Sequence, residues 1–251
     1  MRRTAMITGA TSGIGAATAR LLAKSDFNLI LVGRREEQLM TIRTECEKLG
    51  AEIYTGVLDV RDQEAVHNFI LYLPRHWQEI DILINNAGLA VGLETIDRGR
   101  IDDWDRMIDT NVKGLLYVTK AVSPIMVERK TGHIINIGST AGTEVYANGG
   151  VYCATKPAVH ALNKAMRIDL VEHGIKVTNV APGAAETEFS EVRFKGDKKR
   201  AKSVYDGFKP LTPEDVADVI LFALNQPEHV CLNEIVMTCT AQANSTTIKR
   251  S

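Results

Sequence analysis

The sequence has few cysteines, and its histidines show no metal-binding pattern. Four cysteines occur in 251 residues and none forms a C-x-x-C pair, which excludes a disulfide-rich secreted fold. The six histidines lack metal-ligand spacing, so we expect no metal site. No apolar run is long enough to span a bilayer, and the run after Met1 is interrupted at Thr8 and Gly9, unlike a signal peptide. We therefore expect a cytoplasmic protein.

An excess of one charge is also missing. The formal net charge is -1, with acidic and basic residues interspersed, which argues against a nucleic-acid or anionic-membrane partner. A composition of 45% hydrophobic and 24% charged residues is typical of one globular domain with a sizeable core. We expect residues 1–251 to form a single domain that acts on a small molecule.

Short apolar segments rich in β-formers alternate with longer segments of helical periodicity. This alternation predicts an α/β fold of the Rossmann type, a doubly wound seven-stranded parallel sheet. A last helix is expected from Thr212-Pro213, where a capping residue precedes proline and two acids. Residues 184–210 fit neither a strand nor a clear helix, and we interpret them as a substrate lid. The expected strands cover residues 5–8, 29–32, 53–57, 80–84, 133–137, 176–180 and 233–237.

A glycine-rich turn follows the first expected strand and opens a helix. Its sequence, T-G-A-T-S-G-I-G at residues 8–15, allows the backbone to turn tightly and approach a pyrophosphate at a helix N-terminus. An ordinary glycine turn is the alternative. The position after the first strand of an alternating fold favours a dinucleotide site.

The end of the second strand indicates which dinucleotide is bound. A carboxylate there would bind the ribose 2′-hydroxyl of NAD, whereas arginine accommodates the 2′-phosphate of NADP. The sequence has Gly33-Arg34-Arg35 at this place, and arginines oppose the dipole of a helix N-terminus. The pair therefore predicts a phosphate contact, with a solvated helix start as the alternative.

Polar residues follow the next strands as well. Asp59 comes after the third strand, and Asn86 lies in the segment N-N-A-G after the fourth. Such residues either terminate a strand or let the backbone pass close to an adenosine. Asn111, an amide within an expected helix, is unfavourable there, and a structural role and an active-site role are both open.

Tyr152 and Lys156 are four residues apart in an apolar helical segment, so they lie on the same helix face. A nearby cation favours the phenolate and moves tyrosine toward acid/base chemistry. The spacing alone also occurs in ordinary helices. Ser139 follows the fifth strand, and its hydroxyl and the Tyr152 phenol can converge on one small substrate carbonyl. Pro157 is expected to kink the helix locally.

Together these residues resemble the short-chain dehydrogenase/reductase family, over essentially the whole chain. The motifs are T-G-x-x-x-G-I-G, N-N-A-G, Asn111, Ser139 and Tyr152-x-x-x-Lys156. Several further segments are similar to the NADP-dependent 3-hydroxy acid dehydrogenases. They are G-R-R at 33–35, I-D-T-N at 108–111, G-H-I-I-N-I-G-S at 132–139, and T-E-F-S with V-R-F-K-G-D in the lid.

The resemblance implies a catalytic role for four residues. Ser139 would hydrogen-bond the substrate oxygen, and Tyr152 would exchange the alcohol proton. Lys156 would hold the nicotinamide ribose and, together with the positive charge of the oxidised nicotinamide, lower the pKa of Tyr152. Asn111 would maintain a water-linked proton path behind Lys156. The family also implies a homotetramer and the cofactor NADP. The expected NADP contacts are Gly9, Thr11, Ser12, Gly13, Ile14, Gly15, Arg34, Arg35, Asp59, Val60, Asn86, Ala87, Gly88, Tyr152, Lys156, Pro182, Gly183 and Thr187.

A small acid needs its carboxylate held, and Arg193 in the lid is the candidate, with Ser139 and Tyr152 at the hydroxyl. A surface or subunit contact is the alternative role for Arg193. Two other functions stay open: a broad carbonyl reductase of aldehydes and ketones on the same fold, and a non-catalytic NADP-sensing regulator. The complete set of catalytic residues argues against the regulator.

Overall fold

The computed structural model describes residues 2–251 and contains a seven-stranded sheet in the order β3-β2-β1-β4-β5-β6-β7. All six neighbouring pairs are parallel. The strand order reverses between β1 and β4, where such sheets bind ligands beyond their carboxyl ends. The doubly wound parallel sheet predicted from the sequence is confirmed. Its strands are β1 (Arg3–Thr8), β2 (Phe27–Gly33), β3 (Ile53–Val57), β4 (Ile82–Asn85), β5 (Gly132–Ile137), β6 (Ile175–Pro182) and β7 (Glu234–Met237).

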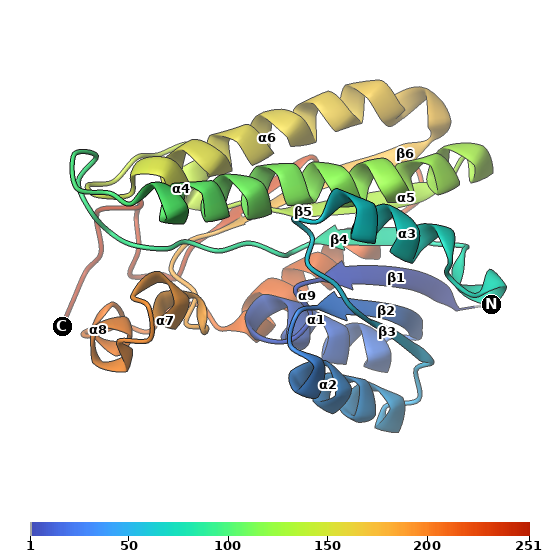
Figure 1. Cartoon of the computed structure of the whole chain (residues 1–251), viewed down its shortest axis with the longest axis horizontal. Coiled ribbons are helices and arrows are strands. Elements are labelled where there is room, and N and C mark those ends of the chain that lie inside the picture. The colour runs from blue at the N-terminus through green and yellow to red at the C-terminus, as the bar shows by residue number, and fades with distance from the viewer. Residues whose placement is uncertain (1) are drawn as a thin grey trace.

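Helices cover both faces of the sheet (Figure 1). One face carries α1 (Gly13–Lys24), α2 (Glu36–Lys48) and α9 (Pro213–Leu224). The other carries α3 (Gln63–Leu71), α4 (Ile101–Ile108), α5 (Leu115–Arg129) and α6 (Gly150–Leu170). Two short helices, α7 (Phe189–Arg193) and α8 (Lys198–Ser203), lie beyond the carboxyl ends of the strands.

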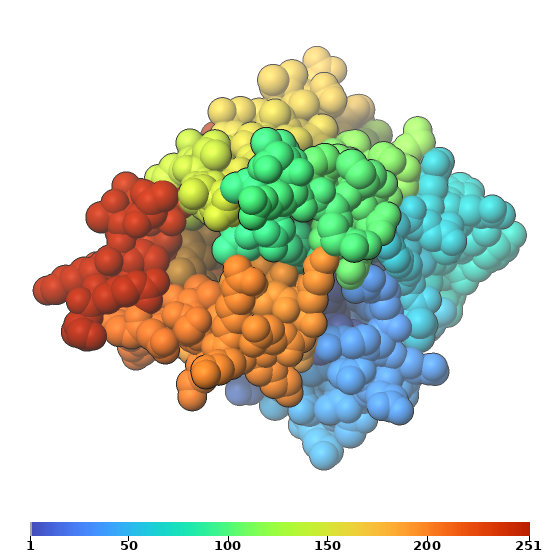
Figure 2. All heavy atoms as spheres, turned by 60° about the vertical axis from the view of Figure 1, so that its left-hand side comes forward, coloured from blue at the N-terminus to red at the C-terminus, as the bar shows by residue number. Residues whose placement is uncertain are grey.

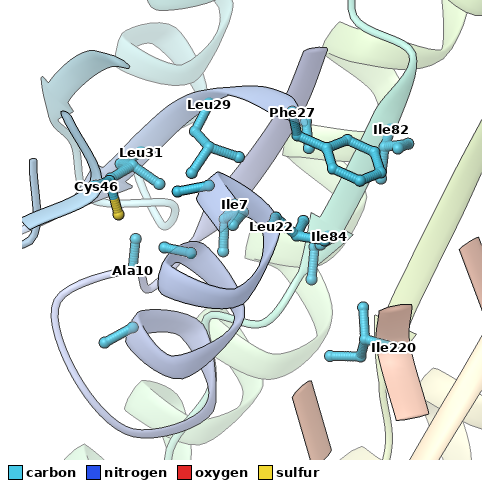
Figure 3. Close-up of a cluster of buried hydrophobic side chains, with 14 of the residues drawn as sticks. Ile7, Ala10, Leu22, Phe27, Leu29, Leu31, Cys46, Ile82, Ile84 and Ile220 are labelled. Atoms are coloured by element: carbon cyan, nitrogen blue, oxygen red, sulfur yellow. The ribbon is translucent and has the colours of Figure 1, made fainter. Parts of the chain in front are cut away.

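Alternate residues of each strand enter opposite cores, because successive side chains of a strand point to opposite faces. Ala5 and Ile7 of β1 pack against α1 and α9, in the core shown in Figure 3. Met6, between them, packs against α5 and α6 on the other face. All three are fully buried. This two-sided burial explains why the strands are apolar at almost every position.

Local signals explain where several helices begin. Thr212 and Asp215 form a reciprocal capping box with Pro213 at the first position of α9, as expected. α6 continues through Pro157 without a break, and Tyr152 and Lys156 remain in its first turns.

The lid, residues 184–210, is more regular than the sequence predicted. It contains α7 and α8, and the side chain of Asp197 accepts a hydrogen bond from the Arg200 amide to cap α8. Helices of this length carry too few turns for a periodic apolar pattern to reveal them.

Candidate active site

A cleft of about 630 Å³ opens at the carboxyl ends of the strands, under the lid. Loops that follow β1, β2, β3, β4, β5 and β6 form its floor. Ser139, Arg193 and nearly all of the expected NADP contacts line it. Two predicted site residues, Gly15 and Asn111, are not among the residues that line it.

The glycine turn forms a cradle whose shape depends on missing side chains. Gly13 has φ +51°, a left-handed conformation that favours glycine. A Cβ on Gly15 would collide with the Gly9 carbonyl oxygen and the Asn86 side-chain amide. Asn86 donates to the carbonyl oxygens of Thr8 (2.8 Å) and Gly9 (3.1 Å), which ties the β1 and β4 loops together. The backbone at the start of α1 therefore stays open for a pyrophosphate.

Arg34 and Arg35 both line the cleft, at the end of β2. Arg35 donates to the Thr11 hydroxyl (3.1 Å) and pairs with Glu188 of the lid (2.8 Å). Both guanidinium groups are about half exposed, so they remain available to an anion entering the cleft. This arrangement fits the 2′-phosphate of NADP.

Asp59 lies beside these arginines. Arg61 binds it with two side-chain nitrogens, the shorter contact being 2.6 Å, and Arg34 lies 4.0 Å away. Burial alone would raise the pKa of Asp59, but the hydrogen bonds from Arg61 and the charges of Arg61 and Arg34 hold it below the usual value. Asp59 is therefore ionised and fixed at the edge of the cleft.

Ser139, Tyr152 and Lys156 meet at the inner end of the cleft. Ser139 precedes the short turn of residues 140–142, and its hydroxyl accepts from the Ala141 amide at 3.1 Å. The Lys156 ammonium donates to the Ile137 carbonyl at 2.9 Å and lies 5.8 Å from the centre of the Tyr152 ring. The helical spacing of Tyr152 and Lys156 thus brings both side chains to the end of β5, as expected.

Burial dominates the electrostatics of this pair. It raises the pKa of Tyr152, while the Ser139 hydroxyl and the Arg193 guanidinium oppose part of the rise. It lowers the pKa of Lys156 to about 8. The family resemblance implies a lowered pKa for Tyr152 when Lys156 acts together with the oxidised nicotinamide; in the protein alone the shift is upward, because desolvation of the phenolate outweighs the Ser139 hydrogen bond and the Arg193 charge.

Asn111 lies in a π-helical turn, η2 (Asp109–Gly114), between α4 and α5. Its side chain accepts from the Leu89 amide and donates to the Leu89 carbonyl, both at 2.8 Å. It also donates to the Thr155 hydroxyl at 3.1 Å. The buried amide thus joins the β4 loop to the catalytic helix. Its expected role in a proton path behind Lys156 stays a prediction.

Arg193, at the end of α7, reaches into the cleft from the lid. Its guanidinium lies over three aromatic rings, with distances to the ring centres of 5.0 Å for Tyr152, 5.1 Å for Phe189 and 5.5 Å for Tyr146. Its backbone carbonyl accepts from the Gly92 amide at 2.9 Å. Arg193 therefore lines the cleft, and a subunit contact stays its alternative role.

Sequence reasoning missed two contributors to the cleft. Tyr146 is a single aromatic residue in the loop before α6 and belongs to no recognisable sequence motif. Residues 238–251, which we call the tail, supply Gln242, Ser245, Ile248 and Arg250 to the lining. Arg250 donates to lid carbonyls of Val204 and Asp206, and Figure 2 shows the tail and the lid side by side. Only the three-dimensional path of the chain reveals these contacts.

Neither a cluster of metal ligands nor a membrane-spanning helix occurs in the part of the chain that the structure describes. Across residues 2–251, no cluster of three or more His, Cys, Asp or Glu side chains is arranged to hold a metal ion. Within the same part of the chain, none of the helices combines the length and the apolar character that crossing a membrane requires.

A dinucleotide cradle beside a Ser-Tyr-Lys group defines a class of nucleotide-dependent oxidoreductases, and comparison with known proteins agrees. The family model described as short chain dehydrogenase matches residues 3–198. The chain belongs to the short-chain dehydrogenase family. The NADP-dependent 3-hydroxy acid dehydrogenase YdfG of Salmonella typhi is 45% identical over 239 residues, covering 95% of each chain. The NADP-dependent 3-hydroxy acid dehydrogenase of Schizosaccharomyces pombe is 43% identical over 250 residues, covering 99% of this chain and 96% of the relative.

Solved structures give the same result. A structure described as the closed form of serine dehydrogenase complexed with NADP+ superposes with a TM-score of 0.93 and 43% identity, covering 99% of this chain and 100% of that one. Serine dehydrogenase from Escherichia coli gives a TM-score of 0.83 and 40% identity, covering 96% and 99%. The predicted family is therefore confirmed.

Proposed function

We propose that this protein is an NADP-dependent dehydrogenase that transfers a hydride between NADP(H) and a small 3-hydroxy acid such as serine, allo-threonine or 3-hydroxypropionate. The observation that carries the proposal is the position of Arg193, whose guanidinium lies 5.0 Å from the ring of Tyr152 inside the cleft. A proton acceptor and a carboxylate-binding cation thus face the same small space. The similarity to two NADP-dependent 3-hydroxy acid dehydrogenases and to a serine dehydrogenase complexed with NADP+ supports this assignment.

Different residues of the cleft would bind the cofactor and handle the substrate proton. Gly9, Gly13 and the N-terminus of α1 would hold the pyrophosphate, and Arg34 and Arg35 the 2′-phosphate. Bound NADP supplies the hydride acceptor of the reaction. Ser139 would hydrogen-bond the substrate oxygen, and Tyr152 would take the hydroxyl proton during oxidation. Lys156 would hold the nicotinamide ribose and keep positive charge near the phenol.

Arg193 would select for an acid. A guanidinium binds a carboxylate with two parallel hydrogen bonds, which also fixes the orientation of the substrate. A carboxylate anchored at Arg193 and a hydroxyl at Ser139 and Tyr152 define a molecule with both groups a few bonds apart. A reductase of neutral aldehydes and ketones would have no use for this cation.

The test is NADP reduction at alkaline pH with serine, allo-threonine, 3-hydroxypropionate and 3-hydroxyisobutyrate. We expect turnover with at least one of them. Tight NADP binding without turnover of any acid would overturn the proposal and favour the NADP-sensing regulator. Turnover of neutral alcohols at equal or higher kcat/KM would favour the carbonyl reductase.

We further propose a homotetramer in a reducing, cytoplasmic compartment. Two separate surfaces expose apolar side chains: Ile101 and Leu116 of α4 and α5 are 61% and 38% exposed, and Phe222 and Val236 of α9 and β7 are 59% and 56% exposed. Exposed apolar side chains on different faces of the sheet support a tetramer with two kinds of interface. Light scattering should give a molar mass of four times 27.6 kDa.

All four cysteines are free, as a reducing compartment permits.

A further inference from the structure

Arg193 is held by aromatic rings that belong to different parts of the chain. Phe189 lies one turn earlier in α7, whereas Tyr146 and Tyr152 belong to the loop before α6 and to α6 itself. Tyr152 and Phe189 also contact each other edge to face, with ring centres 5.5 Å apart. Stacking over aromatic faces stabilises a guanidinium while leaving the N–H groups in its plane free.

The N–H groups of the Arg193 guanidinium have very few hydrogen-bond acceptors. One terminal nitrogen of Arg193 donates to the Tyr146 phenol oxygen, and among residues 2–251 this is the only hydrogen bond made by the guanidinium. Its Nε atom is buried and has no partner in the same residues. No carboxylate of the described chain lies within ion-pair distance of Arg193. Since buried donors in proteins are nearly always paired, the free edge of Arg193 is arranged for a ligand acceptor.

Tyr146 is itself fixed by packing. Its ring lies against Gly149, where an added Cβ would come within 2.6 Å of a ring carbon. The Gly149 amide donates to the Tyr146 carbonyl at 3.1 Å, closing the turn that leads into α6. Tyr146 is therefore carried by the same rigid segment as Tyr152, while Arg193 arrives from the lid.

We infer that Tyr146 is a positioning residue that orients Arg193 toward the substrate carboxylate. By accepting one N–H from the guanidinium, the phenol oxygen sets the rotation of its plane, so that the remaining donors face the acid bound at Ser139 and Tyr152. This inference rests on the proposed function. It assigns recognition of the carboxylate to a pair, one residue in the lid and one beside the catalytic helix.

Burial supports this arrangement, because it raises the pKa of Tyr146 above its ordinary value, so that the hydroxyl stays protonated at alkaline pH as well. The oxygen then accepts from Arg193 while its own proton is free to be donated. A neutral phenol adds no charge to the carboxylate site, so a single cation faces a single anion.

The experiment compares an acid with its uncharged isostere, 3-hydroxypropionate with 3-hydroxypropionamide, in steady-state NADP reduction. For each enzyme the ratio of kcat/KM for the acid to kcat/KM for the amide is measured. Tyr146→Phe keeps the ring and removes the acceptor, and it should lower this ratio about tenfold, mainly through KM of the acid. Arg193→Met should lower the ratio further, by about a hundredfold, because it removes the cation itself.

Tyr205→Phe is the matched control. Tyr205 also lies in the lid and lines the cleft, but its hydroxyl contacts Ser190 and the Ala185 carbonyl rather than Arg193. Loosening the lid by this change should affect the acid and the amide alike and leave their ratio near the wild-type value. Circular dichroism and the Kd of NADP confirm that each variant is folded.

The outcomes distinguish failure of the proposed function from failure of the positioning role of Tyr146. If the wild-type enzyme turns over none of the hydroxy acids, the proposed function fails. If Arg193→Met lowers the ratio but Tyr146→Phe does not, the proposed function stands and the positioning role of Tyr146 is wrong. If Tyr146→Phe and Tyr205→Phe lower the ratio equally, Tyr146 acts only through lid stability, which also overturns the inference.

Discussion

The two ends of the cleft are built in different ways. The cofactor end consists of strand ends and the first turn of α1, where backbone conformation decides the shape. The substrate end consists of the lid, the loop before α6 and the tail, which are joined by side-chain contacts such as Arg193 to Tyr146 and Arg250 to the Val204 carbonyl. The shape of the cofactor end is therefore a property of the sheet. The shape of the substrate end depends on contacts between segments far apart in the sequence.

This difference explains how one fold serves many substrates. The cradle cannot change without collisions, as the close approach of Gly15 to the Gly9 carbonyl illustrates. The lid is held by ion pairs and hydrogen bonds at its surface, which single substitutions can replace. We therefore expect cofactor choice to depend on a few positions such as Arg34 and Arg35, and substrate choice to depend on α7 and its neighbours.

The largest effect is expected where the two ends meet, at Tyr152. Tyr152→Phe removes the proton acceptor but keeps the ring that packs against Phe189. We expect kcat to fall by about 10² to 10⁴, the usual contribution of general acid/base catalysis, while the Kd of NADP stays close to wild type. Stopped-flow turnover and fluorescence titration measure the two quantities. Appreciable residual turnover would contradict the assignment of Tyr152.

The cofactor end is tested by replacing Arg34 and Arg35 with alanine together. Each arginine can form charge-assisted hydrogen bonds and an ion pair with a 2′-phosphate, whereas a 2′-hydroxyl carries no negative charge to pair, so we expect NADP affinity to fall roughly a hundredfold. The Kd of NAD should change severalfold at most. Isothermal titration with both nucleotides gives the comparison, and an equal loss for the two would refute the phosphate contact.

The same contrast decides what could be predicted from the sequence. The strands and the glycine turn were predictable, because apolar runs and glycine positions are local signals of the backbone. Tyr152 and Lys156 were predictable because helical spacing fixes their common face. Tyr146 and the tail were not, since their place at the cleft depends on contacts with residues such as Arg193, distant in the sequence.

The effect of burial on Tyr152 could not be predicted from the sequence either. Helical spacing identifies a nearby cation, but the depth of burial, which the sequence does not reveal, sets the direction of the Tyr152 pKa shift in the protein alone. The same burial lowers the pKa of Lys156 to about 8. Charge neighbours follow from spacing, whereas desolvation follows from the complete packing of lid, loop and helix.

This balance predicts opposite pH profiles for the two directions of the reaction. Oxidation needs the phenolate of Tyr152, whose pKa burial raises, so the rate should fall about tenfold for each pH unit below that pKa. Reduction needs the protonated phenol and should fall as the pH rises. Arg193→Met removes a cation that opposes the rise, and should move the acid limb of oxidation of a neutral alcohol to higher pH. Profiles of kcat/KM in both directions check this, and a shift to lower pH would contradict it.

The smallest effect is expected at the ion pair that holds the lid at the substrate end. Lys195, which adopts φ +54° after α7, places its ammonium 2.7 Å from the Asp103 carboxylate of α4. Asp103 is 11% exposed and Lys195 49%, so the pair is half open to solvent. In Figure 2 the lid, drawn in orange, meets the green segment that contains α4.

Lys195→Met keeps the length of the side chain and removes the charge, which should raise KM for the hydroxy acid less than about fivefold, the range of a partly exposed ion pair. The Kd of NADP should not change, because the other lid contact, Glu188 with Arg35, remains at the cofactor end. Arg43→Met, which breaks the exposed pair with Glu47 in α2, is the matched control and should leave KM unaltered. A change in NADP affinity equal to the change in KM would show instead that the lid moves as one unit, and that the two ends of the cleft are not independent.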